Sequence, residues 1–345
     1  MSDVLFEEVV GNGGNLGVIT LNRPKALNAL NHMMILSLSE KLEQWEKNPS
    51  IKAIVLQACP GRAFCAGGDV RAVYEKKIKN DSNLIQFFKD EYDLNRRIFH
   101  YPKPYISYLN GITMGGGAGI SIHGSHRVGT ENLIFAMPET SIGFFPDIGS
   151  SYFLARLPHA MGLYMGLTGE KISAGDCAEL GITTQMISPD RFAELTNKLA
   201  ETQLPDNAAV TTCIDAFSIP KLPAGLFQYQ KEISENFQKK SVEEIIKSLK
   251  STDNSWCQKT AEIMETKSPT SLKVTFQELQ QARVLNFDEC MKMEFGIMQQ
   301  FLHSHDFFEG IRALLIDKDR KPKWQPSTLE TVLPENLAAF FPKIQ

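Results

Sequence analysis

The sequence lacks the features that mark several large classes of protein. Its 345 residues include only six cysteines, and no two of them form a C-x-x-C pair, so neither a zinc site nor a dithiol redox centre is indicated. At this low density in a long chain, we expect free thiols in a reducing compartment. No apolar run approaches the roughly 18 residues that a membrane helix needs. The N-terminus is acidic and shows no signal or transit peptide, so none is expected.

Strong charge of either sign is also missing. The 36 basic residues nearly balance the 40 acidic ones, for a net charge of −4, whereas a general nucleic-acid binder would be strongly basic. The dinucleotide-binding pattern G-x-G-x-x-G fails as well, because a match starting at Gly115 would need glycine where Ile120 stands. The phosphate-binding pattern G-x-x-x-x-G-K-[ST] does not occur. A local basic patch for a phosphate-bearing ligand stays possible.

The first half of the chain alternates strand-like and helix-like patterns. In the predicted helix 33–47, Ile35, Leu38, Leu42 and Trp45 recur on one face. The segment 80–100 is charged, carries four aromatic residues, and is expected to form a partly exposed helix. The expected strands are 16–21, 52–57, 105–109, 127–129 and 133–136, and a short helix is expected at 117–123. This alternation predicts an α/β domain.

The pattern becomes helical after about residue 200. Ser241 and Glu244 form the sequence of a capping box before an apolar run, and Ser268-Pro269 is typical of a helix start. A long amphipathic pattern covers 289–303. We therefore expect an α/β catalytic core at 1–200 and a helical C-terminal region at 201–345.

Two glycine clusters each stand where a strand should turn into a helix. They are Gly67-Gly68 and the triplet Gly115 to Gly117. A double glycine alone usually marks a tight turn. Three consecutive glycines cost backbone entropy, and they are expected where a backbone or ligand approaches closely. If the N–H groups of both clusters converge, they form an oxyanion hole, which indicates acyl chemistry on a small molecule.

Two acids, Glu139 and Asp147, follow eight residues apart in unusually apolar surroundings. Glu139 alone would most often be a solvated surface acid, and Asp147 alone a helix cap, because a helix is expected to begin at Ile148. Apolar neighbours such as Phe135, Met137 and Phe144 instead indicate a cleft that is partly closed to water. The loosely spaced histidines His123 and His126 are read as structural, and no metal site is expected.

Several long motifs resemble the crotonase (enoyl-CoA hydratase/isomerase) superfamily. These motifs are residues 22–30, 64–69 and 110–117. The segments 137–147, 268–273, 305–310 and 322–324 resemble more narrowly the branch that hydrolyses 3-hydroxyisobutyryl-CoA. The likeness covers residues 4–340, with its motifs in the family's order.

The resemblance implies a crotonase fold, built of stacked β-β-α units with a helical C-terminal region. It implies that the N–H groups of Gly68 and Gly116 bind the thioester oxygen and that Glu139 is catalytic. Asp147 matches an acid of the hydrolase branch at a position that is usually glycine in hydratases, and Glu91 matches a glutamate that lines the substrate pocket. Hydratases carry a second catalytic glutamate where this chain has Gly119, so weak hydratase activity is expected.

The resemblance thus implies hydrolysis of a short β-hydroxyacyl-CoA, with 3-hydroxyisobutyryl-CoA from valine breakdown as the expected substrate. Glu139 either attacks the carbonyl or activates water; the sequence leaves both routes open. Asp147 and Glu91 would hold the substrate hydroxyl. Arg23, Lys25 and Arg71 are candidates for binding the coenzyme A phosphates, although an ordinary surface role fits each equally well.

Other readings stay open. The chain could catalyse another reaction of the superfamily, namely hydration or isomerisation, or it could bind acyl-CoA without turnover. The expected partner is the acyl-CoA substrate, with no nucleic acid, membrane or separate cofactor, and the family implies a possible homo-oligomer. Eukaryotic relatives work in mitochondria. Because no presequence is seen, we expect the bacterial cytoplasm, with a mature mitochondrial matrix form as the alternative.

Overall fold

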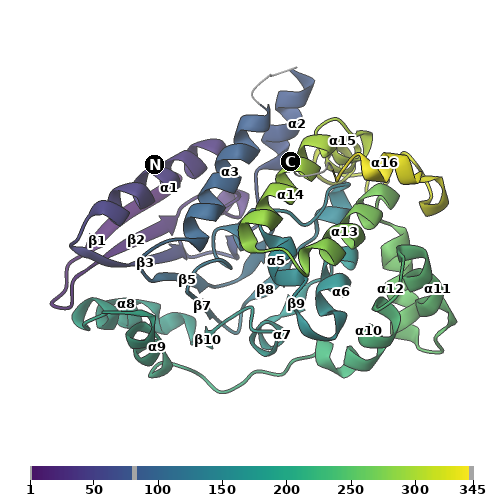
Figure 1. Ribbon diagram of the computed structural model, residues 1–345. Coiled ribbons are helices and arrows are strands. Elements are labelled where there is room, and N and C mark those ends of the chain that lie inside the picture. The colour runs from purple at the N-terminus through teal and green to yellow at the C-terminus, as the bar shows by residue number, and fades with distance from the viewer. Residues whose placement is uncertain (1, 80–83, 342–345) are drawn as a thin grey trace. The chain divides into compact units, whose positions relative to one another are not determined.

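The computed structural model describes residues 2–79 and 84–341 (Figure 1). The chain divides into two compact units that are interleaved along the sequence. The first comprises residues 1–69, 93–135 and 172–227, and the second comprises 70–92, 136–171 and 228–345. The expected division into a core at 1–200 and a helical region at 201–345 does not coincide with these units, because residue 200 lies within the first of them. That division stays a prediction. Every helix in the described ranges is too short or too polar to cross a membrane.

The first unit is built on two sheets. The larger sheet has the order β1-β2-β3-β5-β7-β10, in which only the β1–β2 pair is antiparallel. Its strands are β1 Val4–Val9, β2 Asn15–Leu21, β3 Ile51–Ala58, β5 Tyr105–Leu109, β7 His126–Gly129 and β10 Gln185–Met186. The smaller sheet has the order β4-β6-β8-β9. Its strands are β4 Ala63–Cys65, β6 Ile112–Met114, β8 Ile134–Ala136 and β9 Ile172–Ser173. The five expected strands are confirmed.

Helices cover both faces of the larger sheet because side chains alternate along each strand. Leu16 faces a core that includes Leu195 and Leu199 of α8. The next residue, Gly17, faces the other way and leaves room for the Trp45 ring of α1. A Cβ added to Gly17 would lie only 2.5 Å from that ring. The helices of this unit are α1 His32–Lys47, α4 Gly116–Gly119, α7 Ala174–Glu179, α8 Phe192–Glu201 and α9 Asn207–Asp215.

Helix α1 shows why the sequence pattern was informative. Asn31 caps it by accepting a hydrogen bond from the Met34 N–H at 2.9 Å. The expected apolar face is buried, with Ile35 and Leu42 fully inaccessible. Helix α3 (Leu84–Phe99) confirms the helix expected at 80–100, of which residues 80–83 lie outside the described residues.

The second unit is almost entirely helical. Besides the start of α3 it contains α2 Val70–Ile78, α5 Ser150–Leu154, α6 Met161–Thr168, α10 Gln230–Phe237, α11 Val242–Ser251, α12 Ser255–Glu265, α13 Pro269–Ala282, α14 Phe287–Phe301, α15 His305–Ile311 and α16 Pro334–Ala338. Ser241 and Ser268 cap α11 and α13 as expected. The capping box at α11 is only half formed, because Glu244 accepts from the Lys240 N–H rather than from that of Ser241.

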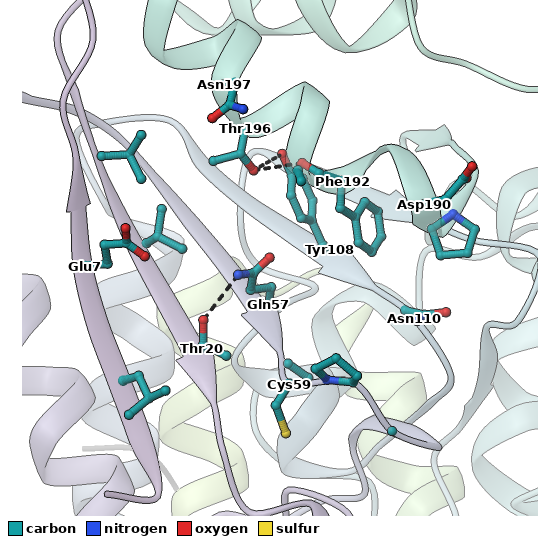
Figure 2. Close-up of a pocket in the computed structure, with 18 residues that line it drawn as sticks. Glu7, Thr20, Gln57, Cys59, Tyr108, Asn110, Asp190, Phe192, Thr196 and Asn197 are labelled. Atoms are coloured by element: carbon teal, nitrogen blue, oxygen red, sulfur yellow. Dashed lines mark hydrogen bonds between the residues drawn. The ribbon is translucent and has the colours of Figure 1, made fainter.

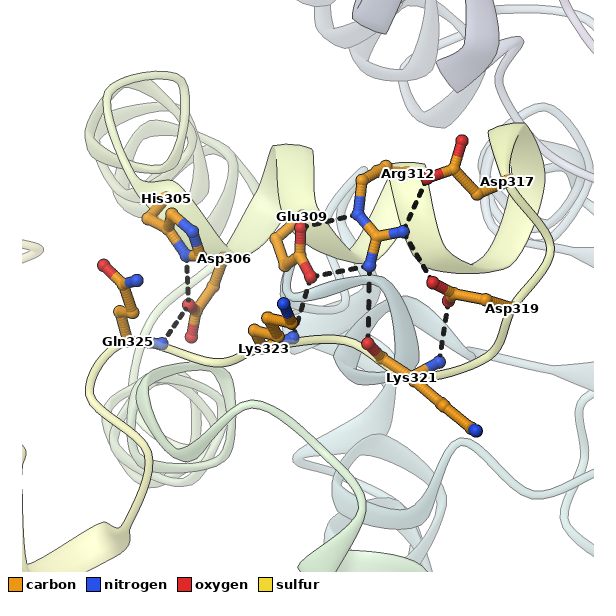
Figure 3. A network of polar contacts seen from close by, with 9 residues as sticks. All are labelled: His305, Asp306, Glu309, Arg312, Asp317, Asp319, Lys321, Lys323 and Gln325. Carbon is orange, nitrogen blue, oxygen red and sulfur yellow. Dashed lines mark hydrogen bonds and ion pairs between the residues drawn. The ribbon is translucent and has the colours of Figure 1, made fainter.

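The C-terminal segment is held by a polar network around Arg312 (Figure 3). Its guanidinium binds both carboxylate oxygens of Glu309 at 2.8 Å, and Asp317 and Asp319 at 2.6 and 2.7 Å. Asp306, buried at the start of α15, accepts from the Gln325 N–H at 2.7 Å and from the Ser268 hydroxyl at 2.6 Å. These bonds tie the chain after α15 to α13 and α15.

Candidate active site

The two glycine clusters lie together in the first unit. Leu30 donates to the Gly67 carbonyl at 2.8 Å and accepts from the Asp69 N–H at 2.8 Å. Gly67 has φ +114°, and a Cβ added there would lie 3.3 Å from the Met114 carbonyl oxygen and 3.6 Å from the Gly116 nitrogen. The positive φ favours glycine at position 67, and the two glycine clusters lie side by side, while the tight-turn interpretation of Gly67-Gly68 stays open.

The amide groups of Gly68 and Gly116 do not take part in closing this loop. Leu30 bonds the residues on either side of Gly68, so the N–H of Gly68 points away from Leu30. Gly116 is the first residue of α4, where N–H groups have no partner inside the helix. Gly115 before it has φ +49° and ψ −126°, a backbone conformation suited to glycine. That these two amides bind a ligand oxygen stays a prediction.

The predicted acids lie together in the second unit. Glu91 lies on α3, Glu139 begins the short helical turn Glu139–Ile142, and Asp147 lies in the loop before α5. All three are at least 93% buried. Glu91 Oε1 and Glu139 Oε2 are buried and have no hydrogen-bond partner in the described part of the chain. Buried acids with open oxygens are typical of a substrate site.

Asp147 does not cap a helix. The N-cap of α5 is Gly149, and no side chain of its own segment caps it. Asp147 Oδ2 instead accepts a hydrogen bond from Tyr92 Oη at 3.1 Å. The helix-cap interpretation is therefore wrong, because the chain makes a further turn between Asp147 and the first helical residue, Ser150.

Two further acids belong to this cluster and escaped the sequence analysis. Glu278 of α13 and Glu294 of α14 are both fully buried. Neither carboxyl oxygen of Glu278 has a hydrogen-bond partner among the described residues. The signal that could have found them is an acid on the apolar stripe of an amphipathic helix: Glu278 falls between the buried residues Val274 and Ala282 at helical spacing.

Burial and mutual repulsion raise the pKa values of these carboxyls. Loss of solvation is the first cause for each, and repulsion from Asp147 raises the pKa values of Glu91, Glu139, Glu278 and Glu294 further. The pKa of Asp147 rises to about 7 despite the hydrogen bond from Tyr92, which lowers it. With the pKa of Asp147 near 7, the cluster can take up and release a proton near neutral pH.

Close packing of α15 supports the turn that carries Glu139. A Cβ added to Gly310 would lie 2.2 Å from the Ile142 carbonyl oxygen. A Cβ added to Gly143, whose φ is +69°, would lie equally close to the Asp306 carbonyl oxygen. The helix anchored by Asp306 and the Arg312 network thus packs its backbone directly on the Glu139 turn.

Other candidate residues have local partners. Arg23 pairs with Asp69 at 2.8 Å, and Arg71 donates to the Leu315 carbonyl at 3.1 Å. Their role toward coenzyme A, like that of Lys25, stays a prediction. Within the described ranges, no group of three or more His, Cys, Asp or Glu side chains is arranged to hold a metal ion.

A separate cavity of about 840 Å³ lies in the first unit, over strands β1–β3 and helix α8 (Figure 2). Tyr108 stacks on Phe192 with ring centroids 4.4 Å apart, and Gln57 donates to Thr20 at 3.2 Å. Among the described residues that line this cavity there is no member of either glycine cluster. It is distinct from the candidate oxyanion hole.

Comparison with known proteins identifies the relatives of this chain. Residues 16–341 match the model of the enoyl-CoA hydratase/isomerase family. The mitochondrial 3-hydroxyisobutyryl-CoA hydrolase of Danio rerio is 41% identical over 336 residues, which cover 96% of this chain and 87% of that protein. The human protein of the same name is 38% identical over 345 residues, which cover 99% of this chain and 89% of that protein.

A solved structure has the same fold. A carnitinyl-CoA dehydratase from Mycobacterium thermoresistibile is 35% identical, with a TM-score of 0.91 over 100% of this chain and 98% of that one. An enoyl-CoA hydratase from Rhodobacter sphaeroides is 32% identical, with a TM-score of 0.87 over 99% of this chain and 97% of that one. The expected crotonase fold with its helical C-terminal region is confirmed.

Proposed function

Because this chain belongs to the enoyl-CoA hydratase/isomerase family, we propose that it hydrolyses the thioester of a short β-hydroxyacyl-CoA. The observation that carries the proposal is the buried group of Glu91, Glu139 and Asp147, with open carboxyl oxygens on Glu91 and Glu139. The names of the vertebrate relatives support 3-hydroxyisobutyryl-CoA as the substrate. Water and the thioester would give 3-hydroxyisobutyrate and free coenzyme A.

The glycine amides would stabilise the charge that develops on the thioester oxygen. The carbonyl oxygen would lie between the N–H groups of Gly68 and Gly116, whose positions are set by the backbone before the reaction begins. Loss of one such donor typically costs about 100- to 1,000-fold in rate.

Glu139 would supply the base or the nucleophile. It either attacks the carbonyl, giving an anhydride that water then cleaves, or takes a proton from the attacking water. In both routes the sulfur leaves and is protonated as the free thiol. The raised pKa values of the cluster fit a group that passes protons near neutral pH.

Asp147 and Glu91 would recognise the β-hydroxyl group. A site whose buried polar groups bond a hydroxyl rejects a substrate that lacks it, because those groups are left unpaired. Glu91 Oε1 is such a group, since it has no partner in the described ranges. This supports a preference for β-hydroxyacyl over plain acyl thioesters.

The main alternative within the family is hydration or dehydration, as in the names of the solved relatives. It is favoured less because Gly119 occupies the place of the second hydratase glutamate. Binding of acyl-CoA without turnover is favoured less because a binding module needs neither Glu139 nor Asp147.

The cellular setting follows from the proposed substrate. We place the reaction in valine breakdown, with coenzyme A bound by its phosphates to basic residues such as Arg23, Lys25 and Arg71. The relatives are named as mitochondrial, which supports the matrix alternative. The bacterial cytoplasm and a homo-oligomer stay predictions.

The decisive experiment measures free thiol released from 3-hydroxyisobutyryl-CoA, isobutyryl-CoA and crotonyl-CoA. Rapid release from the hydroxylated substrate alone supports the proposal. Loss of the crotonyl-CoA enone absorbance without thiol release would show a hydratase and contradict it. Tight acyl-CoA binding with no reaction would show a binding protein.

A further inference from the structure

Glu294 reaches from α14 to the turn that follows Asp147. Its Oε2 accepts a hydrogen bond from the Gly149 N–H at 2.6 Å, and its Oε1 accepts from the Ser151 N–H at 3.0 Å and the Ser151 hydroxyl at 2.5 Å. One fully buried carboxyl thus holds three donors of a segment 143 to 145 residues away in the chain.

The turn held in this way is strained. Ile148 has φ +62° and Gly149 has φ +79°, and the Asp147 carbonyl accepts from the Ser150 N–H at 3.1 Å. The two central residues of this β-turn are therefore both left-handed, and a β-branched residue such as Ile148 rarely adopts that conformation. Such a turn persists only where its surroundings enforce it. The bonds from Glu294 to Gly149 and Ser151 do so here.

The consequence reaches Asp147, because it is the first residue of the strained turn. Its backbone carbonyl closes the turn, and its carboxyl accepts from Tyr92 on α3. A change of backbone angles at Ile148 would move Asp147 away from Tyr92. We propose that Glu294 is a positioning residue, which holds Asp147 in place for the hydrolysis proposed above by bonding Gly149 and Ser151. This inference rests on that proposed function for its effect on rate.

Glu294 has other ionisable neighbours, which the test must take into account. Tyr92 of α3, Glu278 of α13, Asp147 and the thiol of Cys290 all interact electrostatically with it. A change in charge at Glu294 therefore affects several groups. The readouts must report on Asp147 itself and on the chemical step.

The primary variant is Glu294→Gln. Its amide nitrogen faces at least one N–H donor of the turn, so at least one of the three bonds is lost. We expect kcat to fall up to about 10-fold with KM changed by less than about threefold, the loss typical of one hydrogen bond. Glu289→Gln is the matched control, because Glu289 lies on the same helix and accepts a backbone N–H at 2.8 Å, but at the start of α14. It should keep the wild-type kcat.

A second readout does not depend on turnover. With ¹³C-labelled aspartate, the carboxyl signal of Asp147 is assigned by its absence in Asp147→Asn. It should move in Glu294→Gln and stay in place in Glu289→Gln. If the wild-type chain releases no thiol, the proposed function fails while this signal still tests the positioning role.

A milder variant keeps the test decisive if Glu294→Gln does not fold. Ser151→Ala removes the hydroxyl donor to Oε1 and the contact of that hydroxyl with the Cys290 thiol, but keeps both backbone donors to Glu294. A smaller fall in kcat and a smaller shift of the Asp147 signal are expected. In a folded Glu294→Gln variant, wild-type kcat and an unmoved signal would overturn the inference, even if the melting temperature falls. The same result for Ser151→Ala would overturn it when Glu294→Gln is unfolded.

Discussion

Tyr92 donates a hydrogen bond to Asp147 across 55 residues of sequence, with 3.1 Å between the phenolic and carboxyl oxygens. Both side chains are buried, and burial raises the pKa of the phenol, so Tyr92 remains a donor. The bond offsets part of the cost of a charge on Asp147, whose pKa is raised by burial to about 7. This pair therefore links helix α3 to Asp147, which we propose binds the substrate hydroxyl.

Tyr92→Phe tests this link. Without the phenolic donor, the Asp147 carboxylate loses a stabilising bond, so its pKa rises above about 7. The acid limb of kcat/KM, which reflects loss of a proton from the cluster, should move about one pH unit higher. The measurement is thiol release across the pH range. An unchanged limb would show that Asp147 does not control it.

Glu139→Gln should remove most of the activity. The amide is close to isosteric but neither attacks a thioester nor accepts a proton from water, so kcat should fall by about 100- to 10,000-fold. Circular dichroism and the melting temperature should stay near wild type, since the Glu139 Oε2 atom has no partner to lose in the described residues. Near-normal thiol release from this variant would refute a catalytic role.

Glu278→Gln should stabilise the protein at alkaline pH. Burial, followed by repulsion from Glu294 and Asp147, raises the pKa of Glu278 in the folded state. Above about pH 4.3 the unfolded chain releases the Glu278 proton, whereas the folded chain keeps it. The contribution of Glu278 to the free energy of unfolding therefore falls as the pH rises from about 4.3 toward the pKa of the folded state. The amide removes that dependence.

The measurement for Glu278→Gln is the urea midpoint at acidic and alkaline pH. The difference from wild type should grow with pH, and Glu289→Gln, at a partly buried position on the neighbouring helix α14, is the control substitution. If the difference in urea midpoint is the same at both pH values, the folded and unfolded chains bind the Glu278 proton equally. Folding then does not raise the pKa of Glu278.

Gly310→Ala should damage the Glu139 turn. The added methyl would lie 2.2 Å from the Ile142 carbonyl oxygen, so α15 or the turn must shift. Overpacking of this kind typically costs about 1–3 kcal/mol, and a displaced Glu139 should also lower kcat. Gly225→Ala is the control, because its Cβ would meet nothing within 4 Å. Wild-type stability and kcat in Gly310→Ala would show that the helix yields without cost.

Local elements were predictable because their causes are local. The buried face of α1 follows from the spacing of Ile35, Leu38 and Leu42, and its start follows from Asn31, although the cap itself was not predicted. The helix at α13 follows from Ser268 and Pro269. At α11 the capping-box pattern correctly predicted that Ser241 caps the helix. It wrongly predicted that the Glu244 carboxylate accepts from the Ser241 N–H, because this flexible side chain accepts from the N–H of Lys240, one residue earlier.

The site was predictable in part, and for a different reason. Glu91, Glu139 and Asp147 were identified by motifs that resemble a family, and the local pattern alone favoured a surface acid and a helix cap. Glu278 and Glu294 carry no motif, and each is one acid among many on a C-terminal helix. Their burial depends on which face of α13 and α14 packs inward, and on what that face meets.

By itself, the sequence determined the strands, the capped helices, the glycine clusters and the order of the acids, because hydrophobic spacing and backbone freedom act over a few residues. Only the tertiary structure decided that Leu30 aligns Gly68, that Tyr92 bonds Asp147, and that Glu294 holds the turn beside it. Those contacts join residues dozens to more than a hundred positions apart. Their energies arise from burial and from shared hydrogen bonds, which exist only once the helices have packed.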